Sequence, residues 1–367
     1  MYKISSTLDA GLYINGKEFT GTPLSFVQSV HIAAHAHYQV PLITISLTDM
    51  ADMMSYVGLQ DGVTLQFSLK GLKNIDRRYR VYNWTRLPIS GGFAYTIYGY
   101  HDSPLFFVGT HSQQLRGSSS DVLKWLAADC SIEWHPHNAV TSDSMLWMSP
   151  NSTVAQFAQQ IARYGYVDSK SYMGLAIDSR GVMRYRNIAA LKAPSIKVAY
   201  TVPTPNNDTI QITDFKADNV AGNNNVLVGY QHERVVQSGN TLQQATSVDL
   251  QTDIPIGGIT PLLSANVRTL AKRGGISYSP IDFGNVHANY EQARYQNVRL
   301  ARLNNLSCEF LFGFQTDFEA FDNFLFVAPS SWADNSYNGA YIVTGKVVFI
   351  AGSQYVEKVI GVRMGLS

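Results

Sequence analysis

The chain has 367 residues, enough for two or three domains and a sizeable core. It carries 28 Lys and Arg against 27 Asp and Glu, a net charge of +1, so it lacks the basic excess that tight binding to duplex nucleic acid requires. Charged residues make up only 15%, while Tyr and Phe number 21 and 17; this favours strands and large subunit interfaces over a lone helical enzyme.

The two cysteines, Cys130 and Cys308, are expected to be buried free thiols, because nothing else indicates an oxidising compartment. The first residues contain no apolar signal core, and no window offers the ~20 apolar residues of a membrane span. We therefore expect folding in a cytosol and no stable membrane association.

Residues 1–110 read as strands. Apolar and polar residues alternate over 12–20, 40–47, 62–71, 79–87 and 92–100. Asn15-Gly16 is a strong hairpin signal, and residues 48–57 suggest a short helix or turn. Half a dozen short strands separated by turn residues predict a small barrel or sandwich.

Two amphipathic helices are predicted next, within residues 117–131 and 149–167. The apolar face of the first consists of Val122, Leu123, Leu126, Ala127 and Cys130. That of the second consists of Val154, Phe157, Ala158, Ile161 and Tyr164. Ser118 and Asp121 resemble a capping box, and Gly165 is expected to end the second helix.

The rest of the chain returns to strands. Residues 172–187 predict a hairpin that turns at 179–181, which completes a small α/β module. Short strands are expected at 208–215 and 225–232, long loops at 236–285, and a helix at 289–306. Residues 308–329 and 340–365 are expected to finish the chain as strands.

Clustered histidines are the first candidates for chemistry. His31, His35 and His37 would share one side of a strand, and the pair at i, i+4 would share one face of a helix, as in zinc sites. The metalloprotease pattern needs a Glu after the first His, but Ile32 is there. Polar residues on a strand or loop are the favoured interpretation. The same holds for His135 and His137, which have no nearby Cys or acidic ligand.

Other chemical arrangements are incomplete. Glu133 has no partner carboxylate that would make a glycosidase, so a surface or capping role is favoured. Ser118 to Ser120 precede a helix without a nucleophile elbow, which favours capping. Gly91-Gly92 and Gly274-Gly275 lack the spacing of a phosphate loop. We expect no catalytic residues, no cofactor and no metal.

One basic, aromatic stretch lies in the helix predicted at 289–306. Its residues are Tyr290, Arg294, Tyr295, Arg299 and Arg302. It could contact DNA phosphates or anionic partners. A subunit interface that includes Arg294, Tyr295, Arg299 and Arg302, or a solvated helix face, is favoured over DNA, because Arg and Tyr are both enriched at protein interfaces.

The order of these elements resembles the central hub family of phage tail baseplates, including the tube-like half of type VI secretion spike proteins. Three features carry the resemblance: the Asp61-Gly62 turn before the strand at 62–71, the two helices with cores 121–127 and 153–162, and the C-terminal run from 290 to 363. Each motif is of ordinary composition, so their order and spacing carry the match. Residues 236–285 match nothing in the family.

The resemblance implies a mainly β, α+β fold with two small antiparallel β-barrel tube domains around an inserted α/β module. The expected domains are residues 1–111, 112–195 and 196–367, the last interleaved with the insertion. The implied function is a structural hub: three copies would form a ring that joins a sixfold tail tube to a threefold central spike and lines the ejection channel. DNA would contact it only in passage.

Further partners and location also follow from the resemblance. They are tail tube proteins, a separate spike protein and other baseplate proteins, in a virion assembled in the host cytoplasm. Two alternatives stay open: a tail-tip cell-wall hydrolase, and a carbohydrate-binding β module suggested by the Trp and Tyr content.

Overall fold

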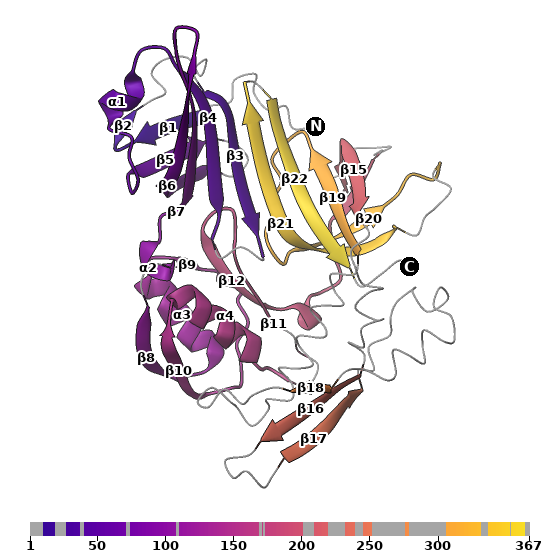
Figure 1. Ribbon diagram of the computed structural model, residues 1–367. Helices are drawn as coiled ribbons and strands as arrows, with labels where there is room; N and C mark the ends of the chain where they lie inside the picture. The colour runs from indigo at the N-terminus through magenta and orange to yellow at the C-terminus, as the bar shows by residue number, and fades with distance from the viewer. Residues whose placement is uncertain are drawn as a thin grey trace.

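Most strands of the chain join one large curved sheet, as the computed structural model shows (Figure 1). The structure describes residues 10–18, 27–36, 40–70, 74–107, 110–168, 171, 173–200, 209–218, 232–238, 245–251, 276–278, 306–331, 337–352 and 354–363. The predicted fold class, α+β and mainly β, is confirmed.

Strands from the first hundred residues form one half of the sheet, in the order β2-β1-β5-β6-β7-β4-β3 with antiparallel neighbours. Their bounds are Ala10–Ile14 (β1), Lys17–Glu18 (β2), Val27–His35 (β3), Leu42–Asp49 (β4), Thr64–Leu69 (β5), Ile75–Ile89 (β6) and Gly92–His101 (β7). The predicted hairpin turns at Asn15-Gly16. The predicted short helix is α1, Met53–Val57, and the buried Asp49 carboxylate accepts the N–H groups of Met53 and Met54 at 2.9 and 2.8 Å.

The second half of the sheet closes into a small barrel. Its strands are Lys197–Ala199 (β13), Thr209–Gln211 (β14), Asp214–Asp218 (β15), Leu306–Phe312 (β19), Asn323–Val327 (β20), Gly339–Ala351 (β21) and Gln354–Arg363 (β22). Neighbours run β14-β13-β20-β21-β22-β19-β15. The ring closes because one continuous segment, residues 209–218, pairs with β13 through its first strand and with β19 through its second.

One long strand, β21, belongs to both halves. Residues 339–342 pair with β20, and residues 345–350 of the same edge pair with β3. The described strands of the first half curl away from β21 as an open half-barrel that ends at β2 (Figure 1).

The prediction of purely antiparallel barrels is wrong in one respect. β13 runs parallel to both β14 and β20. A tight hairpin forces antiparallel pairing, whereas β13 is reached from the α/β module through an extended connection and can enter the sheet in either direction.

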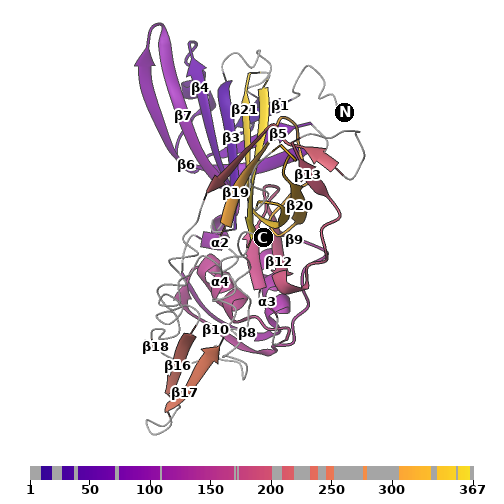
Figure 2. The ribbon, with the colours of Figure 1, turned by 90° about the vertical axis from the view of Figure 1, so that its right-hand side faces the viewer.

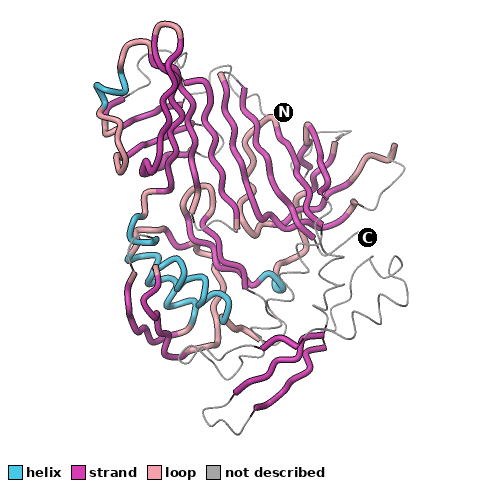
Figure 3. Tube along the Cα trace, viewed as in Figure 1, coloured by secondary structure: helices cyan, strands magenta, loops and turns pink. Residues whose placement is uncertain are grey.

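The inserted α/β module, for which we keep the predicted bounds 112–195, lies below the first half of the sheet and holds the longer helices (Figure 3). Its elements, with those that lead into it, are Pro104–Phe107 (α2), His111–Gly117 (β8), Ser119–Asp129 (α3), Glu133–Trp134 (β9), Met145–Ser152 (β10), Val154–Tyr164 (α4), Met173–Ile177 (β11), Val182–Asn187 (β12) and Ile188–Ala190 (η2). The predicted hairpin is β11–β12, and β9 pairs with β12.

Local signals explain the two helices. Ser118 caps α3 by accepting the Asp121 N–H at 3.2 Å, but the Asp121 carboxylate accepts the Ser118 hydroxyl, so the pair is not the reciprocal box expected. That box occurs at α4 instead, between Thr153 and Gln156.

Gly165 follows α4 as predicted, but it does not adopt the left-handed conformation that glycine often has at the end of a helix. Its φ of −60° is open to any residue. Glycine is needed there because a Cβ would lie 1.8 Å from the hydroxyl oxygen of Tyr185.

Residues 236–285 are not all loop, which corrects the prediction. They contain the end of His232–Ser238 (β16) and the whole of Ala245–Gln251 (β17) and Ile276–Tyr278 (β18), which form a separate three-stranded sheet (Figure 2). Weak alternation hid these strands because Ser, Thr and Gln carry little periodic signal. Of the helix predicted at 289–306, residues 289–305 lie outside the described residues, and Leu306 begins β19.

The described residues form four hydrophobic clusters, the smallest of which lies between the α/β module and the closed barrel and consists of Ala176, Ile188, Ala320, Phe321 and Val362. The other three fill the main parts of the fold. One lies within the half-barrel and includes Val348 and Ile350 of β21. The second packs α3 and α4 against the module strands and contains Cys130. The third fills the closed barrel and contains Cys308. Both cysteines are buried and free, as predicted.

Candidate assembly surface

The outer half of β6 has an unpaired edge. β5 pairs only with Ile75–Arg80 of β6, while β7 pairs along β6 as far as Ile89. Among the described strands, none covers the other edge of residues 82–89. This part of the β6–β7 hairpin extends beyond β5, whereas β4 accompanies β7 as far as Phe93 (Figure 2). We call residues 82–89 the free edge of β6.

The free edge offers backbone hydrogen-bonding groups. Pro88 has no N–H and lies opposite Phe93, so these two cannot be a mutually bonded pair of the antiparallel ladder. The alternation therefore points the N–H and C=O groups of Trp84 and Arg86 away from β7. An edge strand of this kind is a template for pairing with another chain, and Pro88 limits such pairing near the hairpin tip.

Aromatic and aliphatic side chains flank the free edge. Tyr82, Leu87 and Ile89 are 47%, 65% and 41% exposed, unusually high for large apolar residues. Tyr82 stacks on Tyr100 with ring centroids 5.9 Å apart. The only charged side chain, Arg86, lies with its guanidinium 3.4 Å from the Phe93 ring centre. The surface is thus aromatic, weakly charged and suited to a protein partner.

The alternating residues predict this strand but do not predict its free edge. A usable signal was Pro88 within an alternating run, because Pro is tolerated in a strand only where no ladder bond is needed from its nitrogen.

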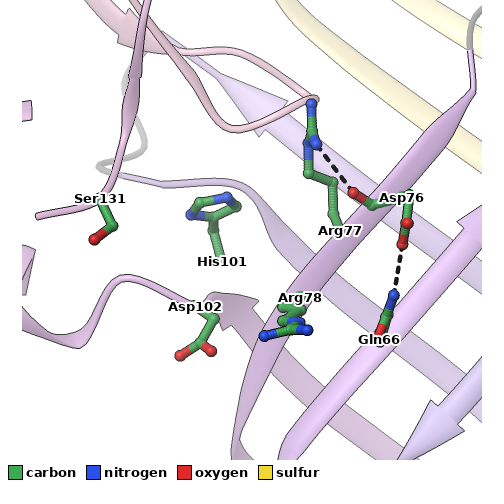
Figure 4. Close-up of a pocket in the computed structure, with 7 residues that line it drawn as sticks. All are labelled: Gln66, Asp76, Arg77, Arg78, His101, Asp102 and Ser131. Atoms are coloured by element: carbon green, nitrogen blue, oxygen red, sulfur yellow. Dashed lines mark hydrogen bonds between the residues drawn. The ribbon is translucent and has the colours of Figure 1, made fainter. Parts of the chain in front are cut away.

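A shallow cavity of about 420 Å³ lies between the half-barrel and the end of α3 (Figure 4). Its lining residues are Gln66, Asp76, Arg77, Arg78, His101, Asp102 and Ser131. Gln66 donates to Asp76 at 2.8 Å, and Arg80 holds Asp102 at 2.8 Å. Both lining carboxylates are therefore engaged in structural contacts, which favours a joint between two parts of the fold over a reaction site.

His101 makes this joint sensitive to acid. Burial and the nearby Arg77 lower the pKa of His101 to about 4, although Asp102 opposes the shift. Unfolded histidine has a pKa near ~6.5, so between these values the unfolded state binds a proton that the folded state excludes. Stability is therefore lost as the pH falls from about 6.5 to about 4, by up to ~3 kcal/mol from this residue.

His101→Gln is expected to flatten that dependence. Urea unfolding of both proteins at pH 7 and pH 4.5 checks it, since other titrating groups contribute equally to the two curves. Parallel losses of stability in wild type and variant would show that His101 is not the group responsible.

The candidate metal residues that the structure describes do not assemble a site. His31 and His35 lie on one face of β3, as the strand interpretation predicts, and His37 lies outside the described residues. His135 and His137 lie with ring centres 5.5 Å apart. Partial burial and neighbouring Arg184 and Arg186 lower the pKa of His135 to about 4, an environment that disfavours another cation. Over the described ranges, no three His, Cys, Asp or Glu side chains come together as metal ligands would.

The remaining described candidates have structural roles, although only Ser118 is the predicted cap, because Ser119 and Ser120 already belong to α3. Ser118 is a helix cap, Ser119 and Ser120 bond to Thr141, and Glu133 is exposed. The predicted interface residues Arg294, Tyr295, Arg299 and Arg302 lie outside the described residues. In the part of the chain that is described, no helix has the length and apolar content to cross a membrane.

No protein-family model matches the chain, and no curated protein matches it in sequence. Among solved structures, it is similar to the tail protein from Neisseria meningitidis MC58, with 10% identity over 97% of each chain and a TM-score of 0.61. It is also similar to the 43 kDa tail protein of prophage MuSo2 from Shewanella oneidensis, with 10% identity over 98% of this chain and 99% of that one and a TM-score of 0.65.

A chain of the Francisella PdpA–VgrG complex is similar as well, with 9% identity over 98% of this chain and 59% of that one and a TM-score of 0.51. At such identities the likeness is one of fold. The chain shares its fold with these two tail proteins and with this chain of the PdpA–VgrG complex over nearly its whole length.

Proposed function

We propose that the chain is the structural hub of a phage tail baseplate. Three copies form a ring that joins the sixfold tail tube to a separate threefold spike and lines the channel through which DNA passes. The observation that supports this most is the fold shared with two tail proteins over at least 97% of each chain.

The proposed division into residues 1–111, 112–195 and 196–367 fits the hydrophobic clusters. The half-barrel, module and closed barrel each have one main cluster. Two barrel-like units per copy would give a threefold ring six similar positions, which is the property a tube-to-spike adaptor needs.

The proposed neighbours are other copies of the chain, tube proteins, the spike and further baseplate proteins, in a virion tail assembled in the host cytoplasm. Arg294, Tyr295, Arg299 and Arg302 stay proposed contact residues. The free edge of β6 is a second proposed contact, because none of the described strands covers it and it presents both backbone groups and apolar side chains.

We also propose that the chain is not an enzyme. A turbidity assay on host cell walls tests this: clearing by the purified protein would favour the tail-tip hydrolase. A carbohydrate-binding module would instead be revealed by retention of the protein on host glycans.

Arg86→Pro tests the contact at β6. The substitution removes an N–H that points away from β7, so the hairpin should persist while strand pairing at the free edge is blocked. Arg86→Ala is the matched control, because it removes the same contact with Phe93 but keeps the N–H.

Copy number of the chain in purified particles measures the effect. Arg86→Ala is expected to assemble as wild type, and Arg86→Pro to fall at least tenfold in incorporation with a melting temperature close to that of Arg86→Ala. Normal incorporation of Arg86→Pro would exclude the free edge from the assembly contacts.

A further inference from the structure

Buried charged side chains cross the junction between the α/β module and the closed barrel. They come from the β11–β12 turn, from the connection between β19 and β20, and from β21 and β22. We propose that the turn, residues 178–181, which we call the plug, holds the module on the sheet through buried charged contacts. Loss of the ion pair between Glu319 and Lys346, against which the plug packs, releases the module in folded form.

The plug is stiffened from inside by Asp178, which is fully buried. One carboxylate oxygen accepts the N–H groups of Arg180 and Val182, both at 3.0 Å. The other accepts Nε of Arg184 at 2.9 Å. The guanidinium of Arg184 then reaches Asp322 in the β19–β20 connection, also at 2.9 Å. The turn is thus preformed and tied to the barrel at its base.

The socket that receives the plug is centred on Glu319, which is 3% exposed. Its carboxylate accepts the Ser179 hydroxyl at 2.6 Å and the Ser179 N–H at 3.0 Å. Nζ of Lys346 on β21 lies 3.3 Å from the same carboxylate. Burial alone would raise the pKa of Glu319, but Lys346 and Ser179 outweigh it and hold this pKa below its ordinary value. The plug therefore meets an ionised carboxylate.

A second carboxylate anchors Lys346 from the far side. Glu357 of β22 lies 3.4 Å from Nζ of Lys346 and accepts the Thr316 N–H at 3.2 Å and the Tyr355 hydroxyl at 2.8 Å. The contacts form one continuous path from β22 through Lys346 and Glu319 to the turn. Glu319 is the member of this path that touches both module and sheet.

The plug also contacts the half-barrel. Gly181 has a φ of +76°, and a Cβ there would lie 2.1 Å from Nε2 of His101 at the end of β7. The turn consequently contacts both halves of the sheet. A change at one of its residues is therefore expected to alter the position of the whole module relative to the sheet.

The buried charges of the junction are better suited to fixing the position of the module than to adding stability to the fold. A buried ion pair gives little net stability compared with apolar packing, whereas removing one partner leaves an uncompensated charge. Such pairs therefore fix one geometry and respond sharply to the loss of a single group. The module has its own hydrophobic cluster, so releasing the plug leaves α3 and α4 packed.

Glu319→Gln in the full chain tests the plug. Hydrogen exchange is expected to rise at least tenfold at residues 178–182, with new protease cleavage between η2 and β13, while α3 and α4 keep wild-type protection. Glu309→Gln is the matched control. It removes the carboxylate from a partly exposed pair with Lys358 at 2.9 Å, outside the junction, and should leave exchange at the turn unchanged.

Unchanged exchange at 178–182 in Glu319→Gln would overturn the proposal. So would joint loss of protection in the turn and in both helices, since the junction would then be part of one folding unit. If Glu319→Gln fails to fold, Ser179→Ala replaces it, because this variant keeps every charge. A rise of at least threefold confined to the turn supports the plug, and no rise contradicts it.

Discussion

Leu126→Asp is expected to unfold the α/β module. Leu126 is 1% exposed on the inner face of α3, packed in the cluster that also holds Val122 and Phe157. An aspartate there has no described cation among its apolar neighbours, and burying it unpaired costs several kcal/mol. Circular dichroism and soluble yield should both show the loss of this module.

Trp125→Asp provides the control for that variant. It places the same charge one residue earlier on α3, where the side chain is 61% exposed. Its melting temperature should remain near that of the wild type. If Leu126→Asp melts like Trp125→Asp, the inner face of α3 is not the buried surface described.

Phe310→Ala should destabilise the closed barrel nearly as strongly as Leu126→Asp destabilises the α/β module. Phe310 is fully buried, and its ring contacts Phe324, Phe326 and Tyr341 at centroid distances of 4.8, 5.1 and 5.2 Å. Deleting a buried ring removes apolar burial and leaves a cavity, for a loss of about 3–5 kcal/mol. Urea unfolding followed by fluorescence measures it.

Phe310→Leu keeps most of the apolar volume and should lose less than half as much stability. Equal losses in the two variants would indicate that the ring itself, and not the space it fills, determines the effect. A loss below about 1 kcal/mol in Phe310→Ala would contradict the barrel core.

The elements that the sequence predicts well are those specified by neighbouring residues. Asn15-Gly16 specifies its hairpin through the turn alone, and Thr153 with Gln156 closes a cap within one helical turn. The spacing of apolar residues correctly placed both helices and the face of each that is buried. Such signals need no knowledge of the rest of the chain.

Features that depend on distant segments were not predictable in this way. β21 pairs with both β3 and β20, and nothing in its own residues announces the second partner. Ser179 and Glu319 bond across 140 positions of sequence. A local signal of this junction was Lys346, the one charged residue of β21, which indicates buried pairing without naming the partner.

The free edge of β6 also combines a feature that neighbouring residues specify with one that a distant segment decides. Alternation predicts that residues 79–87 form a strand, but a strand does not reveal which of its edges is covered. The edge of β6 is free beyond Arg80 because β5 begins only at Thr64, the residue that pairs with Arg80. That outcome depends on the length of a different strand.

An image reconstruction of the purified particle, with the chain located by a small fused tag, tests the hub proposal most directly. The proposal predicts three copies in one ring between the tail tube and the spike, with the two barrels of each copy alternating around the channel. Six copies, a single copy, or a position away from the tube axis would contradict it.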